Sequence, residues 1–162
     1  MPASFTLPEE AKIVSALKPA TDAAGRSGAW VSLKNAHKVY IVVHIDQGNA
    51  ATIQLDIDQA QAVAGTGAKA ITKNVKIWSN LDTAVDDTLV RRADALNYVT
   101  DAGVKVKQVV IELDPSTLDV ANGFDCIRVK TGASNVANLT EAKYILTPLR
   151  FPAATPPSAV AD

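Results

Sequence analysis

Short runs of apolar, often β-branched residues, separated by turn-forming residues, constrain the fold of this 162-residue chain more than any other feature. Within residues 52–59, Ile53, Leu55 and Ile57 alternate with polar residues, as in an antiparallel strand with one buried and one solvated face. Similar runs predict further strands at 39–45, 75–78, 107–114, 126–130 and 143–149. Roughly seven or eight short strands without long helices predict a mainly β, single-domain fold, which is an antiparallel β-sandwich, a jelly roll or a barrel.

Turn residues suggest how some of these strands are connected. Gln47, Gly48 and Asn49 predict a turn, so residues 39–46 and 51–59 are expected to form a hairpin. The spacing of apolar residues within 89–100 does not decide between a strand and a helix. The β-forming residues before the turn at 101–103 favour a strand there over a helix.

The two ends of the chain depart from the strand pattern. Pro8 and the two acidic residues after it predict a short helix that ends at Pro19, and loop-forming residues follow. The last residues hold three prolines and no apolar run that a sheet requires. We therefore expect an N-terminal arm with a short helix at 1–28, a β-domain at 29–150 and a proline-rich, extended C-terminal arm at 151–162.

Composition excludes several classes of protein. The chain has 16 basic and 17 acidic residues, interspersed along its length, which argues against a nucleic-acid or anionic membrane partner. A single cysteine excludes an intramolecular disulfide and a cysteine-rich zinc site. No apolar run is long enough for a transmembrane helix, and the N-terminal residues do not resemble a secretory signal. We therefore expect synthesis and folding in a cytoplasm.

Few residues have the character of a chemical site. Asp56 and Asp58 point the same way on one strand, but a hard cation takes six or more oxygens, so we interpret them as a solvated polar face. His44 lies in an apolar strand and is interpreted as a core or interface histidine, whereas His37 follows a turn and should be exposed. Cys126 is expected to be a small buried residue. We predict no catalytic residues, no cofactor and no metal, and therefore no enzyme.

Large apolar side chains are the candidates for contact with a partner. Trp30 and Trp78 are the main aromatic anchors of a chain with 5% aromatic residues. Each is interpreted first as a core residue and second as an interface residue, because tryptophan is enriched at binding hot spots. Phe151, Pro156 and Pro157 in the tail complete the predicted interface residues.

Several turn-rich stretches resemble a group of small virion proteins of tailed bacteriophages. The resemblance covers roughly residues 14–162 and is carried by residues 21–28, 31–38, 47–52, 118–125, 131–135 and 155–159. It implies a virion structural protein, made in the bacterial host cytoplasm and located on the phage head surface as a capsid decoration (cement) protein. Its partners would be the major capsid protein or other virion proteins, and copies of itself as a homo-oligomer. The resemblance supplies no active site.

Two alternatives remain open at this point. The chain could be another virion component, namely a tail tube, connector or head-fibre protein. It could also be a small β-sandwich module that binds a ligand or carbohydrate, although such modules use clusters of exposed aromatic residues and this chain has few.

Overall fold

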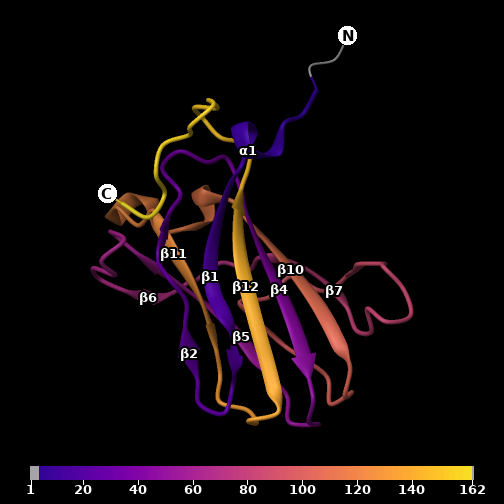
Figure 1. Cartoon of the computed structure of the whole chain (residues 1–162). Coiled ribbons are helices and arrows are strands. Elements are labelled where there is room, and N and C mark those ends of the chain that lie inside the picture. The colour runs from indigo at the N-terminus through magenta and orange to yellow at the C-terminus, as the bar shows by residue number, and fades with distance from the viewer. Residues whose placement is uncertain (1–3, 162) are drawn as a thin grey trace.

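Two antiparallel sheets packed face to face make up residues 4–161, the part of the chain that this computed structural model describes (Figure 1). Sheet A has the strand order β1 (Lys12–Thr21), β12 (Asn138–Leu146), β4 (Val39–Gln47), β10 (Val106–Leu113), β7 (Lys76–Asn80) and β8 (Val90–Arg91). Sheet B has the order β2 (Arg26–Ser27), β11 (Cys126–Thr131), β5 (Gln54–Ala60) and β6 (Lys69–Ala70). In addition, β3 (Val31–Ser32) pairs with β11 and β9 (Asn97–Val99) pairs with β5. The predicted mainly β sandwich is confirmed.

The strand pairs are nested from the ends of the chain inward. Strand β1 pairs with β12, the short strands β2 and β3 pair with β11, β4 pairs with β10, and β5 pairs with β9. Successive pairs lie in alternate sheets, as if one long hairpin were wrapped around itself. Among the three architectures expected, this nesting is that of a jelly roll. Strands β6, β7 and β8 form an insertion between β5 and β9, and β7 and β8 extend sheet A beyond β10.

The core lies between the two sheets and follows the period of two seen in the sequence. In β4, Val39, Ile41, Val43 and Ile45 are fully buried, the buried residues of β10 lie beside them in sheet A, and the buried residues of β5 and β11 in sheet B face them. Each such side chain contributes about 1.5–3 kcal/mol on leaving water. Tyr144 of sheet A spans this core, because its hydroxyl accepts from the Val129 N–H of sheet B (2.8 Å) and donates to the carbonyl of Ala29 (2.9 Å). Its burial raises the pKa of the phenol.

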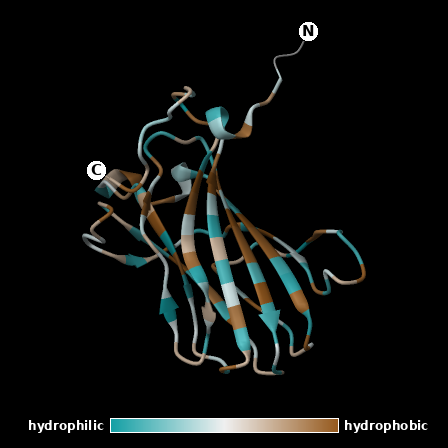
Figure 2. Cartoon of the chain, viewed as in Figure 1, coloured by the Kyte–Doolittle hydropathy of each residue, from teal (hydrophilic) through white to brown (hydrophobic). Residues whose placement is uncertain are grey.

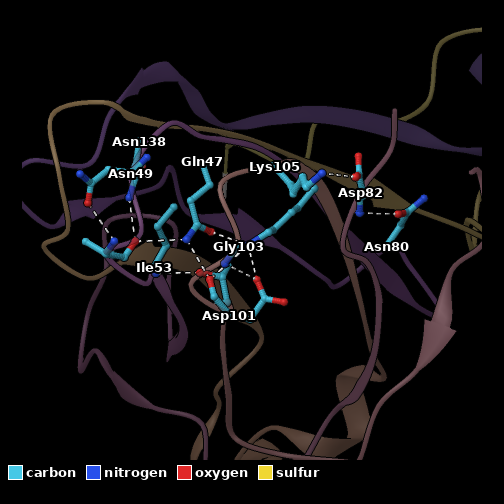
Figure 3. A network of polar contacts seen from close by, with 12 residues as sticks. Gln47, Asn49, Ile53, Asn80, Asp82, Asp101, Gly103, Lys105 and Asn138 are labelled. Carbon is cyan, nitrogen blue, oxygen red and sulfur yellow. Dashed lines mark hydrogen bonds and ion pairs between the residues drawn. The ribbon is translucent and has the colours of Figure 1, made fainter. Parts of the chain in front are cut away.

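The predicted hairpin of residues 39–46 and 51–59 is wrong, because β4 and β5 lie in different sheets. Residues 48–53 cross from one sheet to the other. Asn138 fixes this crossing: its side chain accepts from the Asn49 N–H and donates to the carbonyl of Ala51, each at 2.8 Å (Figure 3). The turn residues were recognised correctly, but β12 and β10 already occupy both edges of β4.

A polar network closes the same end of the sandwich (Figure 3). Lys107 points into the interior, and its ammonium group donates to the side-chain oxygen of Gln47 (2.8 Å), to the carbonyl of Asp101 (3.1 Å) and to the Asp101 carboxylate. Gln47 in turn donates to the same carbonyl at 2.8 Å. The hydrogen bond from Lys107 lowers the pKa of Asp101. The network explains why a lysine can occupy an inward-facing position of β10, since its charge is paired and its donors have acceptors.

The N-terminal region is a second correction. The only α-helix among residues 4–161 is α1 (Leu7–Glu10), and the remainder of the expected helix is strand β1, the outermost strand of sheet A. Pairing with β12 outweighs the weak local helix signal, and a proline is tolerated in β1 because an edge strand has unpaired donors. Residues 12–21 and 26–27 therefore belong to the two sheets, so the predicted N-terminal arm at 1–28 is wrong over this part and the start of the β-domain at 29 is wrong, while residues 1–3 of the arm lie outside the described residues.

The C-terminal segment has no strand or helix within residues 147–161, as its prolines suggested, but it does not extend away from the domain. Pro156 and Ala159 are buried, and the C-terminal segment runs along the end of the sandwich that also carries α1 (Figure 1). The carbonyl of Pro156 accepts from the Lys12 ammonium at 2.9 Å, and that of Ala159 accepts from the Ser32 N–H at 2.7 Å. The expectation of an extended arm is therefore wrong for residues 156–159.

The loop regions contain further short elements. Within residues 89–100 the chain forms strands only at β8 and β9, which lie in different sheets, so the single strand expected there is wrong. Two 3₁₀ turns, η1 (Pro115–Thr117) and η2 (Val120–Asn122), connect β10 to β11. The first is capped by Asp114, whose carboxylate accepts from the Ser116 N–H at 2.8 Å.

Candidate interaction surface

The outer side of sheet A is open to solvent. Figure 1 shows no helix or further strand over β12, β4 and β10, and Figure 2 shows hydrophobic and hydrophilic residues alternating along these strands. In a two-layer sandwich the outer positions are normally polar, because only the inner face packs against the other sheet. This face departs from that rule.

Apolar side chains from five neighbouring strands meet at its centre. Val42 of β4 lies opposite Val110 of β10, which lies opposite Trp78 of β7. In the adjacent row, Tyr40 of β4 lies opposite Ile145 of β12, which lies opposite Ile13 of β1. We call these six residues the apolar face. Five are half-buried and Ile13 is 50% exposed. A hollow of about 320 Å³ lies between Tyr40, Trp78, Val110, Leu89 and Glu112.

Charged residues border the apolar side chains, and two of them continue the same rows: Lys143 lies opposite Val42 and Glu112 lies opposite Tyr40. Glu112 pairs with Lys38 at 2.7 Å and with Lys76 at 3.4 Å. The hydrogen bond from Lys38 lowers the pKa of Glu112, and the same contact raises the pKa of Lys38. Lys143 pairs with Glu141 at 2.5 Å. An apolar centre with a polar, solvent-accessible rim is the usual anatomy of a protein-binding surface.

The two tryptophans lie on opposite faces of the sandwich, and neither is in the core. Trp78 belongs to the apolar face, and the guanidinium of Arg91 lies 4.8 Å from its ring centre. Trp30 lies on the side of sheet B, with Arg128 4.6 Å from its ring centre. The turn at Gly65 also packs on Trp30: the glycine has a left-handed φ of 81°, and a Cβ there would lie 2.7 Å from the indole nitrogen. Both rings are half-buried, so the preference for core positions is wrong.

The structure does not bring the five predicted interface residues together. Phe151 is 63% exposed and Pro157 is exposed, both in the C-terminal segment, while Pro156 is buried against its own chain. Of the five, Trp78 alone belongs to the apolar face. The other five members of this face were missed, because Ile13 lay in the expected helix and the runs that became β4, β10 and β12 were predicted only as strands, without an assignment of their outer sides. The available signal was in β4, where the apolar outer residues Tyr40 and Val42 alternate with core residues in a two-layer fold, whereas polar and charged residues interrupt the outer positions of β10 and β12.

The other candidates for chemistry are accounted for by ordinary contacts. Asp58 was expected on a solvated face but is buried, with Arg128 and Lys130 each at 3.0 Å. His44 is exposed at the edge of the apolar face, and Cys126 is fully buried as expected. Within residues 4–161 no three His, Cys, Asp or Glu residues are placed to hold a metal ion. No helix in that range has the length and apolar character to cross a membrane.

Comparison with known proteins supports the fold. No protein family and no curated protein sequence matches the chain. Among solved structures, the SPBc2 prophage-derived protein YomS is similar with a TM-score of 0.50 and 9% identity, over 89% of this chain and 97% of that chain. A putative sugar-binding protein from Bacteroides thetaiotaomicron has a TM-score of 0.32 and 12% identity, over 76% of this chain and 65% of that chain. Desmodium yellow mottle tymovirus has a TM-score of 0.20 and 12% identity, over 96% and 90%. The last two scores are too low to support an inference.

Proposed function

We propose that this chain is a structural protein of a tailed-phage virion that decorates the head and binds the outer capsid surface through the apolar face. The observation that carries the proposal is the open row Val42, Val110 and Trp78 at the centre of sheet A. The sequence resemblance to phage virion proteins supports it, as does the fold shared with a prophage-derived protein. The proposed partners are the major capsid protein and neighbouring copies of this chain.

The chemistry of the face fits such a role. The apolar face removes six apolar side chains from water on docking, while its charged rim fixes orientation and disfavours wrong partners. A subunit that binds the assembled shell but not the separated capsid proteins stabilises the shell by mass action. Contacts with neighbouring copies of the chain join many modest interfaces on one particle, so their combined binding is stronger than that of any single interface.

The first test is the copy number of this chain in gradient-purified virions of the phage that encodes it. Quantitative mass spectrometry would compare its peptides with those of the major capsid protein. We expect about one copy per major capsid subunit, or one copy per few capsid subunits, because a decoration protein occupies symmetry-related sites on the shell. A handful of copies per particle would move the protein to the tail, connector or head fibre, and absence from particles would overturn the proposal.

A further inference from the structure

A cavity of about 570 Å³ lies at the end of the sandwich opposite the Lys107 network. Its walls come from residues 33–38 before and at the start of β4, residues 114–125 around the two 3₁₀ turns, and residues 148–150 after β12. The first and third walls are tied together, since the His37 N–H donates to the carbonyl of Pro148 (2.9 Å) and the Arg150 N–H to that of Asn35 (2.8 Å). The cavity is distinct from the apolar face.

The interior of this cavity is apolar. Leu33 and Phe124 are buried in the core and form part of its lining, joined by Pro115, Val120 and Pro148. Small-molecule sites have volumes of roughly 300–1,000 Å³ and combine such a lining with a few placed polar groups. The cavity therefore has room for a small organic molecule.

Basic side chains and a histidine line this cavity. Lys34, His37, Lys38 and Arg150 line it, against two carboxylates, Asp114 and Asp125. Lys38 is engaged by Glu112 at 2.7 Å, and Lys34 lies 3.7 Å from Asp125. Arg150 is different: its Nε donates to the carbonyl of Ala36 at 3.4 Å, and its guanidinium forms no ion pair within residues 4–161.

We propose that this cavity binds a small organic carboxylate, with its apolar body on Leu33 and Phe124 and its carboxylate on the guanidinium of Arg150. Arginine presents a planar pair of donors that matches a carboxylate and forms two parallel hydrogen bonds with it. The two acidic residues of the cavity lining disfavour a phosphate dianion more than a single-charged carboxylate. This site is independent of the proposed capsid contact.

Titration of the isotope-labelled protein, followed by amide NMR shifts, tests the proposal with 4-phenylbutyrate as the probe. Shifts should gather at residues 33–37, 120–125 and 148–150. The neutral amide of the same acid should bind roughly tenfold or more weakly, because it cannot form the charge-assisted pair. Inorganic phosphate should cause smaller shifts than the carboxylate.

Matched variants assign the binding to Arg150. Arg150→Gln should weaken 4-phenylbutyrate binding by roughly tenfold or more, and Arg91→Gln, at an exposed arginine outside the cavity, should leave it unchanged. If Arg150→Gln does not fold, Val120→Asp tests the same site, because it adds a negative charge at an exposed lining position and should also weaken binding. Equal binding of the acid and the amide, shifts outside the cavity, or unaltered affinity in both variants would overturn the proposal.

Discussion

The outer faces of the two sheets differ in whether the side chains at their centres have partners within the chain. On sheet B, Asp58 lies between Arg128 and Lys130, and Arg128 also covers Trp30, so charged and aromatic groups are satisfied within the chain. On sheet A, the central positions are Val42 and Val110, which are apolar and half-buried. The centre of one face is occupied by paired charges, whereas the centre of the other leaves apolar side chains partly in contact with water. A difference of this kind within one sandwich identifies the face that is available for a partner.

The largest expected effect comes from placing a charge in the apolar face. Val42→Glu should weaken binding to phage heads that lack this protein by at least about 30-fold, because a charged carboxylate would have to leave water at the centre of the interface. Co-sedimentation of the purified variant with such heads gives the affinity. The fold should be retained, since Val42 is half-buried and lies opposite Lys143.

Val99→Glu provides the matched control on the other sheet. Val99 lies on the outer side of β9, opposite the exposed Gln54, and is 48% exposed. We expect this variant to bind heads as the unaltered protein does. The reverse result, with Val99→Glu impaired and Val42→Glu normal, would place the docking surface on sheet B.

A smaller effect, on stability rather than binding, is expected from sheet B. Arg128→Gln leaves the buried carboxylate of Asp58 with Lys130 alone and uncovers Trp30. We expect a loss of about 1–2 kcal/mol, or roughly 3–8 °C in Tm, which differential scanning calorimetry would measure. Lys143→Gln on sheet A, which removes an exposed pair, should change Tm by less than about 2 °C. Equal Tm changes in both variants would contradict the view that sheet B is satisfied internally.

The smallest expected effect, a change in thermal stability, concerns Glu112, the acidic residue beside the apolar face. The hydrogen bond from Lys38 lowers the pKa of Glu112 below that of the unfolded chain, so its contribution to stability is present above about pH 4.3 and is lost as pH falls through the folded pKa. Glu112→Gln should therefore lower Tm by about 1–2 °C at pH 7. Thermal melts at a pH below the lowered pKa of folded Glu112 should show no difference between variant and unaltered protein. A difference that persists there would mean that Glu112 acts through packing instead.

The strands were the part of the structure that sequence reasoning predicted best. Alternation in β5 placed Ile53, Leu55 and Ile57 in the core, where all three are buried. Strand β1 was missed, because Pro8 and two acids form a genuine helix start whose continuation is overridden by pairing with β12. The apolar face was missed for a related reason: an apolar run does not reveal whether both of its sides or only one is covered.

The sequence by itself determined the alternation of apolar and polar residues along the strands and the positions of turns, because these follow from local steric preference and the period of two. Its single cysteine also excluded an intramolecular disulfide. Tertiary structure alone decided that β4 and β5 lie in different sheets, that Lys107 and Asp58 are buried with partners, and that Val42 and Val110 remain open to solvent. Each of these depends on which strand lies beside which, and pairing is chosen by contacts between residues far apart in the chain.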